Sequence, residues 1–208
     1  MPTETTPEND DWKRIWDARL AALESILGKS ADTVGHAVVP FYLGGTADVL
    51  SFPHYVPGFT FVTADLTGED VGQKPNSLGN YELMICTRSD FPRASDLISK
   101  LARYTCDAVL EPGQSMDLAT FFGDSTLQAL LFTHPTESPA QFTLEGQPCG
   151  LLLCIGITKD ELEFKKANGS AALLEKLHAA GVFPYTVPDR TSVLAPPPEG
   201  FLGRLFGR

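Results

Sequence analysis

The most constraining feature of this sequence is a nearly unbroken apolar run at Cys149–Ile157. A strand covered on one face alternates apolar and polar residues, whereas a strand covered on both faces is apolar along its length. The run is about half as long as the ~20 residues that a transmembrane helix needs. Thr158 and Glu161 follow it with the spacing of a capping box, which satisfies free backbone N–H groups at a helix start. The sequence therefore predicts a central β-strand with layers on both faces, followed directly by a helix.

Shorter segments rich in β-branched and aromatic residues, separated by Pro and Gly, predict the other strands. These segments are His36–Leu43, Asp48–His54, Phe59–Leu66, Tyr81–Thr87, Thr126–Phe132, Ala140–Glu145 and Val182–Val187. Alternation within Tyr81–Thr87 assigns its residues to two faces. One face holds Tyr81, Leu83 and Ile85, and the other holds Glu82, Met84 and Cys86.

Apolar residues spaced close to 3.6 apart predict the helices. The first is capped by Asp10 or Asp11, carries an apolar stripe from Trp12 and ends at Gly28. The others are expected at 95–109, at 159–167, and from Ser170 to Gly181. Clustered strands with helices between them and at the ends indicate the α+β class, with a mixed, largely antiparallel sheet flanked by helices.

The 208 residues suit one domain with short extensions. We expect a disordered leader at 1–10, a single α+β domain at 11–187 and a Pro-rich tail at 188–208. The tail ends by alternating apolar residues with Arg204 and Arg208. This pattern is better explained by a frayed terminus than by an amphipathic docking segment.

The charge balance excludes several classes of partner. There are 16 Lys and Arg residues against 26 Asp and Glu residues, which gives a net charge of −10. A nucleic-acid binder or a protein docked on anionic membranes needs a basic surface, so neither is expected. The acidic start of the chain lacks the features of a signal peptide, and the four cysteines are too few and scattered for a disulfide scaffold. These features predict an acidic cytoplasmic protein, and its oligomeric state is left open.

No motif in the sequence has the pattern of a catalytic, cofactor or metal site. Gly123-Asp124-Ser125 resembles the nucleophile block of GDSL-type esterases, but no histidine follows with the Asp-x-x-His spacing of the general base. A turn before the next strand explains the block better. The four histidines show no metal-ligand spacing. Cys149 and Cys154 would lie on opposite faces of the central strand as buried thiols.

The order of several short motifs resembles the suppressor of fused family over about residues 44–162. They are Gly44-Gly45 with Leu50-Ser51-Phe52-Pro53-His54-Tyr55, Gly79-Asn80-Tyr81-Glu82-Leu83, Leu101-Ala102-Arg103-Tyr104, and Gly156-Ile157-Thr158 with Glu161-Leu162. The family strand often reads Glu-Leu-Thr-x-Arg, whereas this chain continues Met-Ile-Cys-Thr-Arg after Leu83. The chain is also too short for the second domain of animal members. Their transcription-factor binding is therefore not carried over, and no contact residue is transferred.

The resemblance implies a protein-binding scaffold and not an enzyme. Single-domain bacterial relatives look like immunity proteins, which neutralise a toxin by occluding it, and an acidic surface would suit a basic partner. For the contact surface we predict the polar 67–80 loop with Glu69 and Asp70, together with Tyr55 and Glu82. Tyrosines near turns (Tyr42, Tyr55, Tyr81 and Tyr185) would also suit a binding patch.

Two alternatives to this reading stay open. One is a hydrolase that uses Asp124 and Ser125 with a distant histidine. The other is a structural interaction module of a larger assembly that docks through its C-terminal tail.

Overall fold

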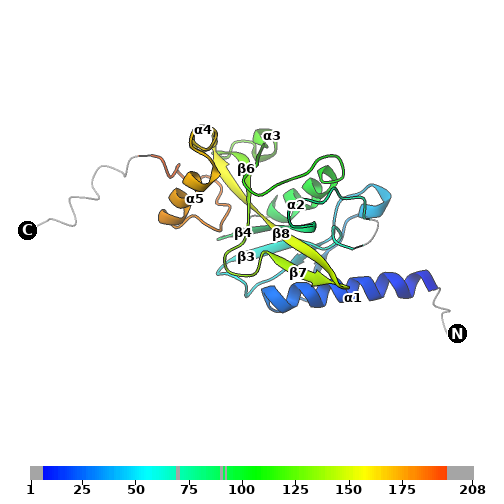
Figure 1. Cartoon of the computed structure of the whole chain (residues 1–208). Coiled ribbons are helices and arrows are strands. Elements are labelled where there is room, and N and C mark those ends of the chain that lie inside the picture. Colours follow the sequence, from blue (N-terminus) through cyan, green and yellow to red (C-terminus); the bar gives the residue numbers. More distant parts are fainter. Residues whose placement is uncertain (1–6, 69–70, 90, 92, 196–208) are drawn as a thin grey trace, which may run out of the picture.

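The computed structural model describes residues 7–68, 71–89, 91 and 93–195 (Figure 1). Eight strands of this described part form one sheet. They are β1 (Val34–Gly35), β2 (Val49–Ser51), β3 (Phe59–Thr63), β4 (Asn80–Thr87), β5 (Ser115–Asp117), β6 (Leu127–Thr133), β7 (Gln141–Leu144) and β8 (Gln147–Thr158). The order across the sheet is β1-β2-β3-β4-β8-β6-β5, and β7 pairs with the first half of β8. The β4–β8 pairing is parallel and its neighbours are antiparallel, which confirms the mixed, largely antiparallel α+β fold.

The apolar run is the central strand, as its composition predicted. β8 is buried from Cys149 to Thr158, with β4 along one edge and β7 and then β6 along the other. Its side chains alternate between two hydrophobic cores, and Cys149 and Cys154 lie in different cores, as expected. Both faces of the sheet are therefore covered.

Helices of different parts of the chain cover the two faces (Figure 1). The core on one face is closed by α1 (Pro7–Leu27), α4 (Lys159–Asn168) and α5 (Ser170–Ala179). The core on the other face is closed mainly by α2 (Arg93–Tyr104), with the 3₁₀ turn η1 (Phe41–Leu43) at its margin. The short helix α3 (Ala119–Phe122) leads into β6.

The strand-to-helix corner after β8 has the capping box that the sequence predicted. The Glu161 carboxylate accepts a hydrogen bond from the Thr158 backbone N–H at 2.9 Å. The same carboxylate is fully buried and forms a bidentate ion pair with Arg190, at 2.5 Å on both sides. It also accepts the backbone N–H of Val193 at 2.8 Å. One side chain thus fixes both the start of α4 and the segment that follows α5.

Several expected elements differ in the structure. The helix expected at 95–109 spans Arg93–Tyr104, and a turn follows it, in which the Thr105 hydroxyl donates to the Ala102 carbonyl. The first helix begins at Pro7. Proline is tolerated there because the first N–H groups of a helix have no helical partner. Residues 1–6 of the expected leader lie outside the described residues. The segment 36–43 is not a strand, because Pro40 starts the η1 turn. The segment 182–187 makes a single bridge, Cys86 to Tyr185, since Pro184 cannot donate a ladder hydrogen bond.

Among the described helices, none combines the length and the apolar composition needed to cross a bilayer.

Candidate functional site

A groove separates the amino-terminal half of α1 from the segment 36–42. Its volume is about 540 Å³, within the usual range for small-molecule pockets. The lining residues are Trp12, Ile15, Trp16, Arg19, His36, Ala37, Pro40, Phe41, Tyr42, Asp48, Asp65 and Val71. We call this feature the α1 groove.

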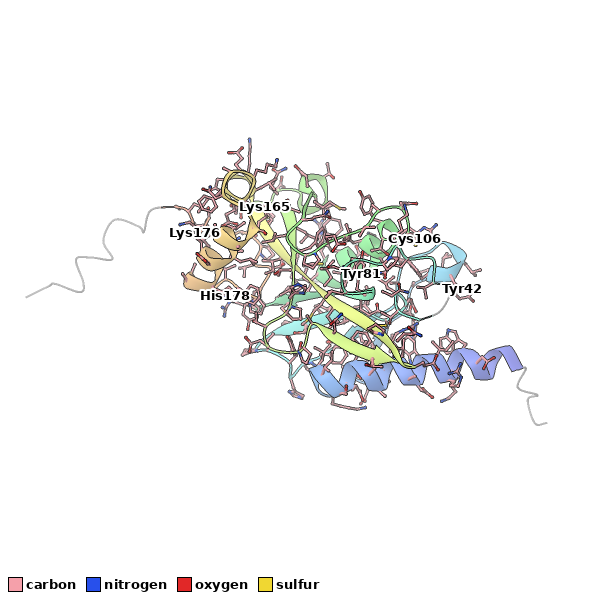
Figure 2. The ribbon with its side chains drawn as sticks, in the orientation of Figure 1. Tyr42, Tyr81, Cys106, Lys165, Lys176 and His178 are labelled. Carbon is pink, nitrogen blue, oxygen red and sulfur yellow. The ribbon has the colours of Figure 1, made fainter. Side chains whose placement is uncertain are left out.

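Exposed apolar side chains gather at the α1 groove. Eight large hydrophobic side chains stand out as exposed in the described part of the chain, and five of them belong to α1 or to residues 38–43. Trp12 is 53% exposed and Tyr42 is 73% exposed; Figure 2 shows Tyr42 on the outer side of its segment, at the end of the molecule where α1 begins. Trp12 also stacks on Trp16, with ring centroids 5.8 Å apart. Of these five side chains, Trp12 and Tyr42 line the groove itself. Exposed aromatic side chains around a groove are typical of surfaces that bind a partner.

A tight backbone turn shapes the second wall of the groove. The carbonyl of Pro40 accepts hydrogen bonds from the N–H groups of Leu43 and Gly45, both at 3.0 Å. A Cβ atom at Gly45 would lie 1.7 Å from the carbonyl oxygen of Val39, so no larger residue fits there without moving the backbone. Gly44 has a φ of +87° but no atom near its would-be Cβ.

Replacing Gly45 with Ala is expected to cost about 2–3 kcal/mol of folding free energy, because the new methyl group overpacks the turn. Gly44→Ala is the matched control: it meets only the left-handed backbone penalty, about 1 kcal/mol. Chemical denaturation of both variants measures the difference. Equal losses would show that the close approach of Val39 does not constrain the turn.

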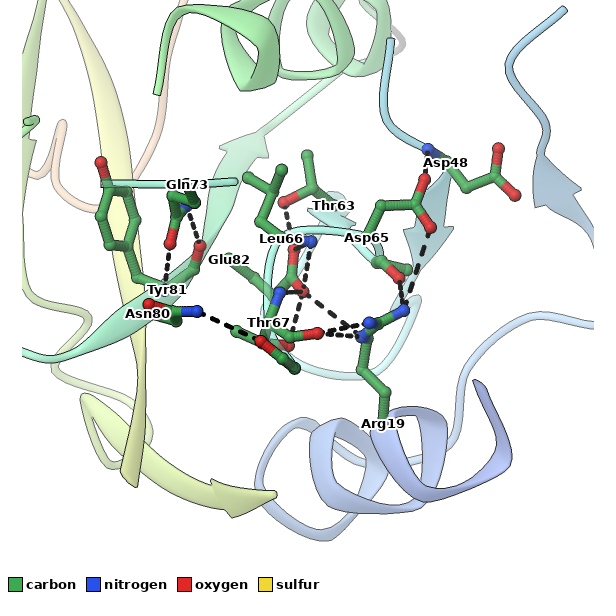
Figure 3. Close-up of polar contacts among 12 residues, drawn as sticks. Arg19, Asp48, Thr63, Asp65, Leu66, Thr67, Gln73, Asn80, Tyr81 and Glu82 are labelled. Atoms are coloured by element: carbon green, nitrogen blue, oxygen red, sulfur yellow. Dashed lines mark hydrogen bonds and ion pairs between the residues drawn. The ribbon is translucent and has the colours of Figure 1, made fainter. Parts of the chain in front are cut away.

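The floor of the groove is a network around one buried arginine (Figure 3). Arg19 extends from α1 and donates to the backbone carbonyls of Ala64 and Thr67. Its guanidinium also pairs with Glu82, at 3.7 Å, and lies 3.9 Å from Asp65. Arg19 therefore ties α1 to the turn that follows β3.

Glu82 is fully buried behind Arg19, and every hydrogen-bond partner around it is a donor. Its carboxylate accepts the hydroxyls of Thr63 and Thr67, both at 2.7 Å. It also accepts the backbone N–H groups of Leu66, at 3.0 Å, and of Thr67, at 2.9 Å. Burial raises the pKa of Glu82, while the Arg19 charge and the two hydroxyls act against that rise.

A second set of polar contacts holds the segment 36–37 at the mouth of the groove. The Asp48 carboxylate accepts the Ala37 backbone N–H and lies 2.7 Å from Nδ1 of His36. The Asp48 backbone N–H in turn donates to Asp65 at 2.7 Å. Burial raises the pKa of Asp65, and the nearby Asp48 charge adds to this effect.

The groove has an excess of negative charge. Three carboxylates, those of Asp48, Asp65 and Glu82, lie near one guanidinium, that of Arg19, which contacts Asp65 and Glu82. Asp48 lies beside the His36 ring instead. A site with more carboxylates than cations attracts positively charged groups. The α1 groove thus combines aromatic walls with an acidic floor.

The 67–80 loop lies between the α1 groove and a second, smaller cavity of about 310 Å³. Val71 lines the α1 groove, whereas Gly68, Pro75, Gly79 and Asn80 line the smaller cavity. The loop is held by contacts from both ends, because its Thr67 carbonyl binds Arg19 and Gln73 binds the Tyr81 backbone. Described residues of the loop therefore line both cavities.

The structure does not bring the predicted contact residues together. Glu82 is fully buried, so it is not a surface contact. The alternating pattern assigned Glu82 to the correct face of β4, but α1 covers that face. Tyr55 lies just before β3, and the first residue of β3, Phe59, pairs with the last residue of β4, Thr87. The 67–80 loop, in contrast, leads into the first residue of β4, Asn80. The two are therefore at opposite ends of β4. Glu69 and Asp70 lie outside the described residues.

Tyr55 is half-buried, and its hydroxyl lies 3.1 Å from the Ser138 hydroxyl. Burial raises the pKa of Tyr55 to about 12, so the hydroxyl is neutral at physiological pH. Of the other tyrosines near turns, Tyr81 and Tyr185 are buried and Tyr42 is exposed. Tyr42 and Trp12 both line the groove. The sequence marked Tyr42 only as one of several tyrosines near turns and Trp12 only as part of the apolar stripe of the first helix.

The hydrolase alternative gains no support from the placement of its residues. Ser125 lies in the bend before β6, where its hydroxyl accepts the Leu127 N–H at 3.3 Å. His134 follows β6 at its other end, and the His178 ring stacks on Phe183.

Burial raises the pKa of the Cys86 thiol to about 12 and that of Cys149 to about 11. The described residues contain no group of three or more His, Cys, Asp or Glu side chains that could hold a metal ion.

Comparisons with known proteins point to one family. The family model described as Suppressor of fused protein (SUFU) matches residues 46–191. The fold is similar to that in the Sufu-Fu complex crystal structure, with a TM-score of 0.65, 15% identity and 93% coverage of both chains. It is also similar to a putative SUFU homolog from Neisseria gonorrhoeae, with a TM-score of 0.64, 15% identity, and coverage of 89% of this chain and 100% of that one.

The third solved structure is longer. Drosophila Suppressor of Fused matches with a TM-score of 0.59 and 16% identity over 81% of this chain, which spans only 46% of the Drosophila chain. No curated protein matches the sequence. The groove lies partly outside the matched family region, because α1 and residues 36–45 precede residue 46.

Proposed function

The chain belongs to the suppressor of fused family, and on this premise we propose that it is a protein-binding scaffold whose contact surface is the α1 groove. One observation carries the proposal: exposed Trp12 and Tyr42 flank a groove with an acidic floor. Aromatic anchors dominate the energetics of protein interfaces, and carboxylates between them select a cationic partner. One of the similar folds was solved as the Sufu-Fu complex, which supports a protein as the class of partner.

We further propose an immunity-type role, in which the chain binds and occludes a toxin or another basic protein. The net charge of −10 would speed association with a basic surface and oppose the phosphate substrate of, for example, a nuclease. Most of this chain matches the bacterial homolog over the full length of that homolog. This match supports the proposal that the domain acts without a second domain. Such a scaffold acts by covering its partner, so it needs no chemistry of its own.

The test is to purify the chain from its native cell with bound proteins, express the captured partner alone, and then restore the chain. We expect the partner to stop growth and the chain to rescue it. A captured partner that does not affect growth would overturn the immunity role. The scaffold proposal would then depend on whether binding maps to the groove.

Substitutions in the groove map the binding surface. Trp12→Ala and Tyr42→Ser should each weaken partner binding by about 10- to 100-fold, the usual effect of losing an aromatic anchor. Phe59→Ser is the matched control, since Phe59 is also exposed but lies at the far end of β3. Titration calorimetry with the purified partner measures the effect. Equal losses in all three variants would exclude the groove as the contact surface.

The 67–80 loop is tested separately. The variant E69K/D70K should weaken binding of a basic partner without lowering thermal stability, because it reverses two charges in the loop whose Val71 lines the groove. An unchanged affinity would remove the loop from the contact surface but leave the groove in it.

A further inference from the structure

The α1 groove has a candidate occupant within the sequence itself. Residues 196–208, which lie outside the described part, read PPPEGFLGRLFGR. The stretch 201–208 has two phenylalanines, two leucines and two arginines, and no acidic residue. We propose that the α1 groove of one copy binds residues 201–208 of a second copy. This inference rests on the proposed role of the groove as a protein-binding surface.

The charges of the two segments are complementary. In a chain with a net charge of −10, the stretch 201–208 carries a net charge of +2 from Arg204 and Arg208. The groove presents Asp48 and Asp65, whose partners are the His36 ring, backbone N–H groups and, at 3.9 Å from Asp65, Arg19. Arg19 is itself shared with backbone carbonyls and with Glu82. A cation that enters the groove therefore meets carboxylates with spare negative charge. Arginine suits such a site because its guanidinium donates to carboxylates and stacks on aromatic rings.

The apolar residues are complementary as well. Phe201 and Phe206 offer flat rings, and the groove presents the rings of Trp12, Trp16 and Tyr42. Aromatic pairs stabilise an interface beyond the area that they bury. Docking would also cover the exposed faces of Trp12 and Tyr42.

The position at which the described chain ends indicates that the tail bound in a groove comes from a second copy and not from the same copy. Val193 is bound to Glu161, just after the end of β8, and Ala195 follows within two residues. The groove floor lies at the other end, because Glu82 pairs in register with Leu151 near the start of β8. Figure 1 shows the end of the described chain beside α5 and the start of α1 on the opposite side of the molecule.

The reach of the tail makes this argument quantitative. From Leu151 to Thr158 the strand covers roughly 23 Å at ~3.3 Å per residue, and the groove lies three strands across, roughly 14 Å further. The direct separation is thus roughly 27 Å. Phe201 is six residues beyond Ala195 and reaches roughly 20 Å when fully extended. Arg204 and Arg208, nine and thirteen residues beyond Ala195, reach roughly 30 Å and 43 Å in a straight line. Only a tail stretched around the outside of the protein would therefore bring these arginines to the groove of the same copy, and Phe201 would still fall short. A second copy meets no such limit, so we take it as the source of the bound tail.

The first test is the mass of the intact protein in solution. We expect the full chain to self-associate with rising concentration in light scattering or sedimentation. The variant R204E/R208E should weaken this association at least tenfold. The control K159E/K166E makes the same change of charge on exposed positions of α4 and should associate like the wild type. A chain that is monomeric throughout, or equal effects of both variants, would overturn the inference.

The second test uses the tryptophans as reporters. The chain has only two, Trp12 and Trp16, and both line the groove. A synthetic peptide of residues 196–208 is titrated into full-length R204E/R208E, whose own tail is disabled. We expect saturable binding with a blue shift in emission, which Tyr42→Ser in the same background should weaken. No shift and no binding would overturn the inference, yet leave the groove to a foreign basic protein, so the two proposals fail independently.

Discussion

Replacing Arg19 with Met is expected to lower the free energy of unfolding by about 3–5 kcal/mol, the usual cost of removing one partner of a buried ion pair. Only 8% of the Arg19 side chain is exposed and none of the Glu82 side chain is. The variant leaves the Glu82 carboxylate without a neutralising charge in the core. It also leaves the Ala64 and Thr67 carbonyls without the donor that holds the turn after β3. Urea denaturation followed by circular dichroism measures the loss.

Two controls separate the buried charge from the loss of a long side chain. Lys13→Met removes an exposed ion pair with Asp17 on the same helix and should cost under about 0.5 kcal/mol. Adding Glu82→Gln to Arg19→Met should recover part of the loss, because the amide oxygen still accepts hydrogen bonds but brings no charge. A loss below about 1 kcal/mol in Arg19→Met would contradict the role assigned to the pair.

The pH dependence of this variant has a defined sign. Burial raises the pKa of Glu82, and Arg19→Met removes the main charge that opposes the rise. A folded-state pKa above the unfolded value makes the folded state bind the proton more tightly. The stability deficit of Arg19→Met should therefore shrink as the pH falls from 7 towards the unfolded pKa of a glutamate, near 4.3. A deficit that grows on acidification would contradict this assignment.

The sequence specified the centre of the fold better than its margins. The uniform apolar character of Cys149–Ile157 requires cover on both faces, and the alternation in Tyr81–Thr87 assigns each side chain to the correct face. Both signals arise from contacts within the element or directly beside it. The segment 36–45 has no such signal, because its turn depends on the close approach of Gly45 to Val39.

Glu82 shows why the contact surface could not be predicted from the sequence. A carboxylate on a half-apolar strand usually faces water, so a surface role was the natural expectation. Its burial depends on Arg19, which is more than 60 residues earlier in the chain and arrives on a different element. The groove depends on the same packing, because α1 continues past the sheet and leaves Trp12 exposed. The residues that form it are ordinary helix and turn residues until the fold places them side by side.

Replacing Arg190 with Met is expected to have a comparable effect at the other end of the molecule. Glu161 accepts two hydrogen bonds from the guanidinium and one N–H each from Thr158 and Val193. Without Arg190 its buried charge is unpaired, which should lower the free energy of unfolding by about 3–5 kcal/mol. The variant should also release residues 186–195, so their amide protons should exchange faster than those of β8. Lys100→Met, which removes an exposed pair with Asp96, is the matched control.

The acid response of the wild type distinguishes this pair from the first one. Burial alone would raise the pKa of Glu161, but the Arg190 hydrogen bonds and charge, with the two backbone donors, hold that pKa below its ordinary value. A depressed folded-state pKa stabilises the protein above the unfolded pKa and loses this effect as the pH falls through the folded value. The stability gap between wild type and Arg190→Met should therefore be largest at pH 7. It should narrow as the pH falls towards 4, because the unpaired carboxyl of the variant takes up a proton, and narrow further below about pH 4 as the wild type loses its own share. A gap that is constant from pH 7 to pH 3 would show that Arg190 stabilises the fold through packing and not through the charge of Glu161.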